Sequence, residues 1–315
     1  MKSAQTPENR TIVGRFAPSP TGPLHLGSLV AAVGSYAMAK RAGGIWLLRM
    51  EDLDTPRVIP GVADDILRTL ESLGFAWDGA VLWQSRRANA YEAALERLLA
   101  SGDVYPCGCS RAEIARAATA PHDGEGELPY PNLCRGGLSP GKVARSFRVK
   151  VSPGPVAFDD LVLGLKSYEL ARVCGDFVVK RADGLFAYQL AVVVDDAAQG
   201  VNQVVRGADL LSSTPRQIHL QRLLGYDTPV YAHLPLVTGP GGAKLSKRDN
   251  AVSLAAGRDL ASDSGRLIFA ALRFLGQCPP STLAGAPGRE VLAWAADHFD
   301  LLSVPLLVSP PAFGP

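Results

Sequence analysis

The sequence lacks three features that would assign a protein to a class at once: a strong net charge, a long apolar run and a disulfide framework. Its 32 lysine and arginine residues against 30 aspartate and glutamate residues leave a net charge of +2, so a polyanionic partner must be met by a local basic patch. No apolar run approaches the roughly 20 residues of a membrane-spanning helix, and the initial MKSAQTPENR has no apolar segment of the secretory kind. We expect a cytoplasmic protein with no membrane partner.

Cysteine is scarce and unevenly distributed. Cys107, Cys109 and Cys134 are close in the sequence, and the total of five is odd. Both facts favour a reducing compartment and a bound metal ion over disulfides, although three unligated thiols would give the same pattern. Cys174 and Cys278 stand alone among apolar residues, which predicts two buried small side chains.

The apolar pattern indicates a mixed α/β protein. Hydrophobic residues make up 47% of the 315 residues, enough for the core of one large domain or two ordinary ones. Strand-like runs at 11–16 and 45–50 enclose a stretch of helical spacing that ends at Gly43 and Gly44. A strand, a helix and a second strand in this order are typical of a parallel sheet.

The rest of the chain divides into segments that differ in composition and in apolar spacing. Helices are expected at 61–73, 86–101, 212–225 and 262–276, and strands at 177–181 and 190–196. Residues 103–160 combine the cysteine cluster with many prolines and glycines, which is typical of an insertion. We predict a Rossmann-type parallel-sheet nucleotide-binding domain in two halves (10–102 and 177–250), an inserted subdomain (103–176) and a short helical C-terminal region (251–315).

The stretch RFAPSPTGPLHLGS, residues 15–28, joins the first strand to the first helix. Its three prolines fix φ, so polar groups on the loop would be held without a large ordering cost when a ligand binds. His25 and Ser28 fall where the helix begins, and a helix N-terminus beyond a parallel strand binds phosphate through its N–H groups. The alternative is a proline-rich turn with a capping serine.

Charged residues follow the second strand: Arg49, Glu51, Asp52 and Asp54. In a parallel sheet this position would place Glu51 beside the opening loop, where a carboxylate can receive a substrate ammonium group. Arg15 could then bind the substrate carboxylate with two hydrogen bonds. A solvated turn would explain the same four charges.

The segment KLSKR, residues 244–248, follows a glycine-rich stretch. Cations on such a loop would lower the barrier to phosphoryl or nucleotidyl transfer, because negative charge grows on the leaving pyrophosphate. A solvated cationic face is the alternative.

Together, and in this order, PSPTGPLHLGS, the strand ending in EDLD, VRGADL (205–210) and KLSKR resemble the class I glutamyl-tRNA synthetases over most of residues 10–255. PSPTGPLHLGS looks like the HIGH region of that family, and KLSKR like its KMSKS loop. The resemblance implies that the glutamate carboxylate attacks the α-phosphate of ATP, bound with magnesium, and that an RNA then takes the glutamyl group. Holding the reactants in line can supply roughly 7 to 11 kcal/mol of the barrier.

The resemblance also implies roles for individual residues. His25 and Lys247 would be catalytic, with His25 at the ATP phosphates and Lys247 at the departing pyrophosphate. ATP binding would involve His25, Gly27, Ser28, Lys244 and Lys247. Binding of L-glutamate would involve Arg15, Phe16, Ala17, Pro18, Ser19, Glu51, Tyr188 and Arg206.

Only residues 249–315 follow the KLSKR segment, whereas glutamyl-tRNA synthetases continue into a helical domain that reads the anticodon. This difference and the cysteine cluster resemble a truncated branch of the family, the glutamyl-queuosine tRNA(Asp) synthetases. The branch implies activation of glutamate without tRNA and transfer to the queuosine base at the first anticodon position of tRNA(Asp). The anticodon loop would enter the catalytic pocket with its bases unpaired, and we expect a monomer.

The same branch implies one structural zinc ion bound by Cys107, Cys109, Tyr130 and Cys134, which would make 103–176 a zinc-bearing subdomain of the acceptor-binding type. Zinc prefers four ligands in a tetrahedron. On ligand chemistry alone, His122 would be the commoner type of fourth ligand.

Three alternatives stay open. The first is a small-molecule nucleotidyltransferase with the same histidine loop. The glutamate-type residues at 15, 51, 188 and 206 argue against it. The second is a glutamyl-tRNA synthetase catalytic module that charges a tRNA 3′ end. The third is a catalytically silent RNA-binding relative, against which His25 and Lys247 speak.

Overall fold

The computed structural model describes residues 10–117, 129–237, 253–257 and 259–306. Its helices are α1 (Leu26–Arg41), α2 (Val62–Ser72), α3 (Ala88–Ala100), α4 (Arg111–Ala117), α5 (Leu170–Val173), α6 (Tyr188–Ala198), α7 (Thr214–Leu224), α8 (Leu260–Phe274) and α9 (Gly288–His298). Its strands are β1 (Val13–Phe16), β2 (Ile45–Met50), β3 (Leu82–Trp83), β4 (Val104–Cys107), β5 (Ser146–Val149), β6 (Val156–Asp160), β7 (Gly164–Tyr168), β8 (Phe177–Lys180), β9 (Gln203–Gly207) and β10 (Val230–Leu234).

Parallel strands form the centre of the fold. Strand β2 pairs in parallel with β1 on one side and β3 on the other, and β9 pairs in parallel with β10. Two hydrogen bonds link the two groups, because Val13 N–H donates to Asn202 Oδ1 (2.8 Å) and Asn202 N–H donates to the Val13 carbonyl (3.1 Å). The predicted α/β fold with a parallel sheet is therefore confirmed, and the carboxyl ends of β1, β2, β9 and β10 lie at one edge.

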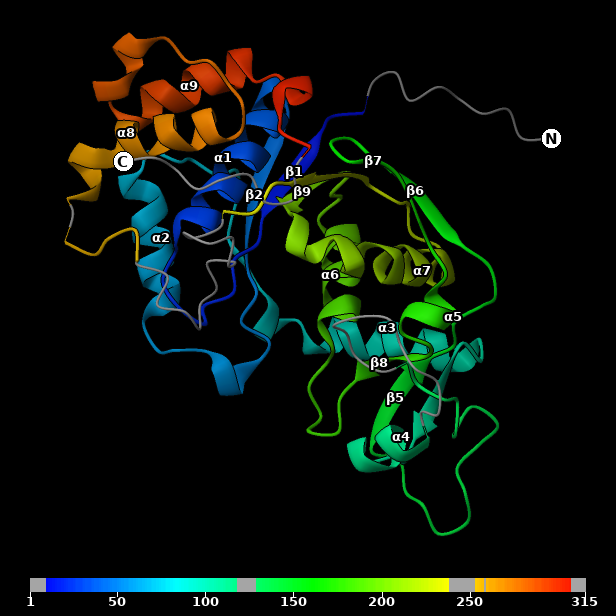
Figure 1. Cartoon of the computed structure of the whole chain (residues 1–315). Coiled ribbons are helices and arrows are strands. Elements are labelled where there is room, and N and C mark those ends of the chain that lie inside the picture. Colours follow the sequence, from blue (N-terminus) through cyan, green and yellow to red (C-terminus); the bar gives the residue numbers. More distant parts are fainter. Residues whose placement is uncertain (1–9, 118–128, 238–252, 258, 307–315) are drawn as a thin grey trace.

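Helix α1 lies between the parallel strands and the C-terminal helices (Figure 1). Its small residues allow this burial on two sides. A Cβ atom at Gly34 would lie 2.4 Å from Leu234 Cδ1, so a larger residue there would force the side chain of Leu234 on β10 to move. Helices α8 and α9 pack on the other side of α1 and against each other. The helical C-terminal region thus completes the core around α1.

A second sheet is antiparallel and contains β4, β5 and β8. The predicted strand at 177–181 exists as β8, but it pairs with β5 of the inserted segment and does not join the parallel sheet. The hairpin β6–β7 is also antiparallel, and β6 reaches back to pair in parallel with β10 at Asp160 and Tyr231. The inserted segment is therefore connected to the parallel sheet through β6.

The predicted strand at 190–196 is wrong, because these residues lie in α6. Every residue from Gln189 to Asp196 is buried, so the helix has no polar stripe and its apolar run has the same appearance as a buried strand. The expected burial of the two isolated cysteines is also wrong for Cys278, which is exposed, while Cys174 is half-buried. Among the described residues, no helix has both the length and the apolar character needed to cross a membrane.

Candidate active site

A cavity of about 340 Å³ opens at the carboxyl ends of the parallel strands, within the size range of small-molecule sites. It brings together residues that are far apart in the sequence. Its lining includes every residue predicted to bind glutamate: Arg15, Phe16, Ala17, Pro18, Ser19, Glu51, Tyr188 and Arg206. It also includes His25, Gly27 and Ser28 of the predicted ATP set, and Asp209, which the sequence did not single out.

The N-terminus of α1 forms one wall of this cavity. His25 is the N-cap residue, and its Nδ1 accepts a hydrogen bond from the Ser28 N–H at 3.2 Å. The cap is therefore the histidine and not a serine. Because Nδ1 is an acceptor, a neutral His25 ring carries its proton on Nε2, a donor that suits an anionic group, as does the positive end of the helix dipole.

Backbone hydrogen bonds fix the proline-rich loop against its surroundings. The N–H of Glu51 donates to the Pro18 carbonyl at 2.9 Å, and the N–H of Leu254 donates to the Leu24 carbonyl at 2.9 Å. The first bond joins the loop to the end of β2, so Glu51 lies beside it as the sequence predicted. The second joins it to the chain that follows the KLSKR segment.

Lys244 and Lys247 lie outside the described residues, as does His122. The described residues that flank the KLSKR segment are informative all the same. Val237 lines the cavity, and Leu254 is bonded to the residue before His25. The chain therefore leaves and re-enters the described structure beside the cavity.

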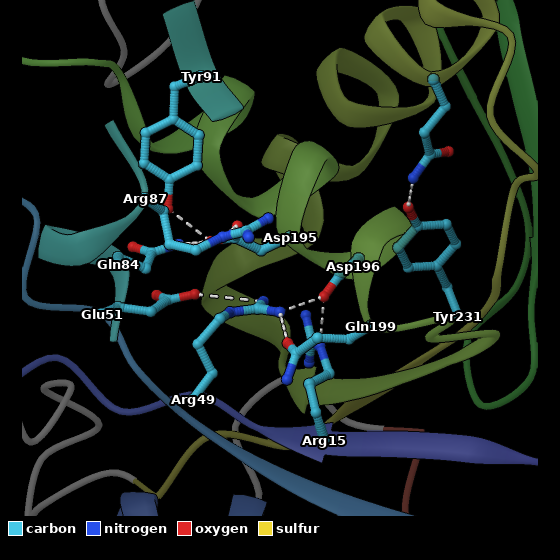
Figure 2. Close-up of polar contacts among 11 residues, drawn as sticks. Arg15, Arg49, Glu51, Gln84, Arg87, Tyr91, Asp195, Asp196, Gln199 and Tyr231 are labelled. Atoms are coloured by element: carbon cyan, nitrogen blue, oxygen red, sulfur yellow. Dashed lines mark hydrogen bonds and ion pairs between the residues drawn. The ribbon is translucent and has the colours of Figure 1, made fainter. Parts of the chain in front are cut away.

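A buried ion-pair network lies behind the cavity wall (Figure 2). Asp196 Oδ1 lies 3.2 Å from Nε of Arg15 and 2.7 Å from Nη1 of Arg49. Arg49 is completely buried, and its Nη2 lies 3.5 Å from Oε1 of Glu51. The network therefore runs from the predicted carboxylate-binding Arg15 through Asp196 and Arg49 to the predicted ammonium-binding Glu51.

The adjacent Asp195 has other partners, which lie in α3 and just before it (Figure 2). It accepts hydrogen bonds from Gln84 (2.9 Å), Arg87 (3.0 Å) and Tyr91 (2.6 Å). None of these four residues lines the cavity among the residues that the structure describes there. Consecutive carboxylates on one helix therefore have different partners, and only Asp196 contacts cavity residues.

The pKa values of the two carboxyl groups in this network, Asp196 and Glu51, shift in opposite directions. Burial alone would raise the pKa of Asp196, but Arg15 and Arg49 outweigh it and hold that pKa below its ordinary value. Burial raises the pKa of Glu51 and exceeds the lowering by Arg49 and Arg15. Asp196 is therefore the ionised partner. A cation bound in the cavity would stabilise the ionised form of Glu51.

Arg206, at the end of β9, lines the same cavity. Its Nε donates to His233 Nε2 at 3.2 Å, and its Nη2 donates to Thr214 Oγ1 at 2.8 Å. Its Nη1 is buried and has no hydrogen-bond partner among the described residues. An unpaired buried N–H of a guanidinium is costly, and an anionic ligand in the cavity would satisfy it.

Sequence reasoning did not identify Asp196, Thr214 or His233 as part of this site. Asp196 had a local signal, since two aspartates end the apolar run LAVVVDD. Interpreted as a strand, that run gave no indication of which carboxylate contacts a residue of the cavity. Thr214 and His233 had no signal of this kind, because only tertiary structure brings them to Arg206. His233 is the register partner of Arg206 in the β9–β10 pair, and Thr214 is the first residue of α7.

The predicted metal ligands converge in the inserted segment. The sulfur atoms of Cys107, Cys109 and Cys134 all lie within 4.8 Å of one another. The Tyr130 hydroxyl lies 3.4 Å from the sulfurs of Cys107 and Cys109. A tetrahedral zinc ion with Zn–S bonds of about 2.3 Å needs ligand separations of about 3.8 Å, so the four side chains fit a metal of this type.

Comparison with known proteins agrees with the geometry. The family described as tRNA synthetases class I (E and Q), catalytic domain, matches residues 11–282. A glutamyl-Q tRNA(Asp) synthetase of Geobacter sulfurreducens is 75% identical over 299 residues, which are 95% of this chain and 95% of the relative. One from Dechloromonas aromatica is 58% identical over 293 residues, which are 93% of this chain and 95% of the relative.

A solved structure extends the comparison to the fold. The glutamate-tRNA synthetase of Elizabethkingia anophelis superposes with a TM-score of 0.78 at 28% identity and covers 94% of this chain, but only 67% of the synthetase is matched. The family match over residues 11–282 and the two relatives decide the assignment. The chain belongs to the class I tRNA synthetase (E and Q) catalytic-domain family, in its glutamyl-Q tRNA(Asp) synthetase branch.

Proposed function

We propose that this chain activates L-glutamate with ATP and transfers the glutamyl group to the queuosine base at the first anticodon position of tRNA(Asp). The observation that carries the proposal is the cavity in which Arg15, Glu51, Tyr188 and Arg206 meet the N-terminus of α1. The 75% identical glutamyl-Q tRNA(Asp) synthetase, matched over 95% of both chains, supports the acceptor.

In the first step the glutamate carboxylate attacks the α-phosphate of ATP, pyrophosphate leaves and glutamyl-adenylate forms. In the second step an acceptor hydroxyl of the tRNA attacks the activated carboxyl group, and AMP leaves. Arg15 and Arg206 would bind the substrate carboxylates, and Glu51 would accept hydrogen bonds from the ammonium group. Binding of that cation would lower the pKa of Glu51, which burial raises. Most of the rate enhancement would come from holding the two reactants in line.

The phosphates belong to the other end of the cavity. His25 at Nε2, and Gly27 and Ser28 at the start of α1, would donate hydrogen bonds to the phosphates of ATP, which would bind with magnesium. Lys244 and Lys247 would stabilise the charge that develops on pyrophosphate. The tethering of both flanks of their segment beside the cavity supports this role.

A second cavity, of about 830 Å³, supports entry of an RNA acceptor. It lies between the inserted segment and helix α6, and Tyr188 lines both cavities. Its lining includes Arg57, Arg111, Arg148, Arg181 and Arg216 against Asp54 and Asp183. An arginine-rich cavity next to the activated carboxyl group suits a phosphate backbone with a base turned toward glutamate.

The metal ion would be zinc with a structural role. The chain's thiolates, together with Tyr130, would bind it and hold β4 to the segment around Cys134. Although burial raises the pKa of Cys107, its hydrogen bonds with Tyr130 and the backbone lower it to about 7, which favours the thiolate form that zinc binds. Burial and the neighbouring thiols Cys134 and Cys107 raise the pKa of Cys109 to about 11, so the metal ion itself would have to displace the proton of that thiol. We expect the purified protein to be a monomer.

Glutamate-dependent exchange of labelled pyrophosphate into ATP tests the activation step. The proposal predicts exchange by the purified protein with no tRNA present. Exchange that appears only after tRNA is added would favour the mechanism of an ordinary glutamyl-tRNA synthetase. Exchange without glutamate would favour a small-molecule nucleotidyltransferase.

A further inference from the structure

His233 and Asp160 form a buried pair next to Arg206, and neither of the two is among the cavity-lining residues that the structure describes. Both side chains are completely buried, and His233 Nδ1 lies 2.5 Å from Asp160 Oδ2. The other ring nitrogen, Nε2, lies 3.2 Å from Arg206 Nε and 3.1 Å from Thr214 Oγ1. The three side chains Asp160, His233 and Arg206 therefore form a continuous chain of hydrogen bonds.

The donors in this series of hydrogen bonds determine which nitrogen of His233 carries the proton. An arginine Nε can only donate, so Nε2 of His233 must be the acceptor. The ring proton is then on Nδ1 and is donated to Asp160. A neutral ring is consistent with the lowered pKa of His233, which results mainly from burial and also from the nearby Arg206, against the raising effect of Asp160.

Asp160 can hold this tautomer because its two oxygens have separate partners. Oδ1 accepts from the backbone N–H groups of Val162 (3.1 Å), Leu163 (2.9 Å) and His233 (3.2 Å). Oδ2 is left for the ring of His233. Burial would raise the pKa of Asp160, but its hydrogen bonds to His233 and the backbone hold it below the ordinary value.

We propose that Asp160 and His233 are positioning residues that orient Arg206 for the carboxylate of the amino-acid substrate, with Asp160 acting through the tautomer of His233. His233 and Thr214 bind two sides of the guanidinium and leave the buried Nη1 unpaired in a residue that lines the cavity. The inference rests on the proposed glutamate site. It also assigns the inserted segment a part in amino-acid binding, since Asp160 lies at the end of β6.

Two substitutions at position 233 separate the two hydrogen bonds. His233→Gln keeps an acceptor near the position of Nε2 for Arg206 but loses the donor to Asp160. His233→Asn keeps a donor near the position of Nδ1 but loses the acceptor. Calorimetry measures the glutamate affinity of both variants. The affinity is expected to fall about tenfold to hundredfold in His233→Asn, because that is the change that the loss of one charge-assisted hydrogen bond causes. The fall should be clearly smaller in His233→Gln.

Asp160→Asn tests the tautomer itself. Three backbone donors require the amide oxygen of the substituted side chain to occupy the position of Oδ1, so its NH2 group faces the histidine ring. The proton is then expected to move to Nε2, opposite the Arg206 donor. Long-range ¹⁵N NMR of the ring should show Nδ1 protonated in the wild type and Nε2 protonated in the variant, with glutamate affinity reduced by about tenfold or more.

His219→Gln is the matched control, because His219 is also a buried histidine but bonds only the Lys150 carbonyl, at 2.8 Å, in the described structure. Its glutamate affinity should equal that of the wild type, and ATP affinity should be unchanged in all variants. Equal affinities in His233→Asn and the wild type, or an unchanged tautomer in Asp160→Asn, would overturn the inference. A wild type that binds glutamate without pyrophosphate exchange would instead refute the proposed function, and the ratios of glutamate affinity would still decide the role of His233.

Discussion

Asp196 and Arg49 form an ion pair of 2.7 Å, with Arg49 completely buried. Asp196 holds Arg15 through the same oxygen, at 3.2 Å. The carboxylate therefore fixes the relative positions of two arginines at the ends of β1 and β2. We infer that this ion pair holds the residues at the glutamate end of the cavity in position.

Asp196→Asn should reduce both stability and glutamate affinity. Removing one partner of a buried ion pair lowers the free energy of unfolding by about 3 to 5 kcal/mol, and Arg15 loses its orientation. Asp195→Asn is the matched control, because Asp195 is equally buried but bonds Gln84, Arg87 and Tyr91. Chemical denaturation and the KM for glutamate should show lower stability in both variants and a raised KM only in Asp196→Asn. Equal KM values in the two variants would contradict this role of Asp196.

Lys247→Ala should lower the rate of activation far more than it lowers glutamate affinity. The charge that Lys247 would stabilise develops on pyrophosphate in the transition state, while glutamate binds elsewhere. Pyrophosphate exchange gives kcat and the KM for glutamate. Lys40→Ala, at the far end of α1 from His25, should behave as the wild type. A wild-type kcat in Lys247→Ala would remove this residue from the mechanism.

Metal analysis should find about one zinc ion per chain. Cys109→Ser should reduce the zinc content and lower Tm, because the ion joins β4 to the segment around Cys134. Cys278→Ser, at an exposed cysteine outside the cluster, should change neither. A fully active preparation without zinc would refute the structural role.

Stability should fall as the pH drops below 6.5. Burial lowers the pKa of His219 and of His233 from the ordinary value of 6.5, so the unfolded chain binds protons on both rings before the folded chain does. Their contribution to the free energy of unfolding is complete above pH 6.5 and is lost as the pH falls toward their folded-state pKa values. Denaturation curves between about pH 5 and pH 7.5 should show this slope, and His219→Gln with His233→Gln should flatten it. An equally steep slope in the double variant would assign it to other groups.

The sequence allowed prediction of features that depend on local order. The strand, loop and helix from β1 to α1 follow from short-range pattern, and the position of Glu51 beside the loop follows from the rule that parallel strands end at one edge. The resemblance to class I synthetases added Tyr188 and Arg206, which no local pattern brings to the cavity. The structure places the loop between β1 and α1 around one cavity with Glu51, Tyr188 and Arg206.

The remaining features depend on tertiary packing. Helix α6 was predicted as a strand because its surroundings bury every residue from Gln189 to Asp196, and a fully buried element has no amphipathic period. Asp160 and His233 are distant in the sequence, and only the pairing of β6 with β10 brings them together. A sequence pattern of one chain contains no signal for such a contact.

The proposed function is tested most directly by incubating the protein with labelled glutamate, ATP and two preparations of tRNA(Asp), one with queuosine and one without it. The proposed function predicts labelled RNA only from the preparation that contains queuosine. The same reaction with Arg206→Ala should give little label in either. Equal labelling of the two tRNA preparations would show transfer to another position and contradict the proposed function.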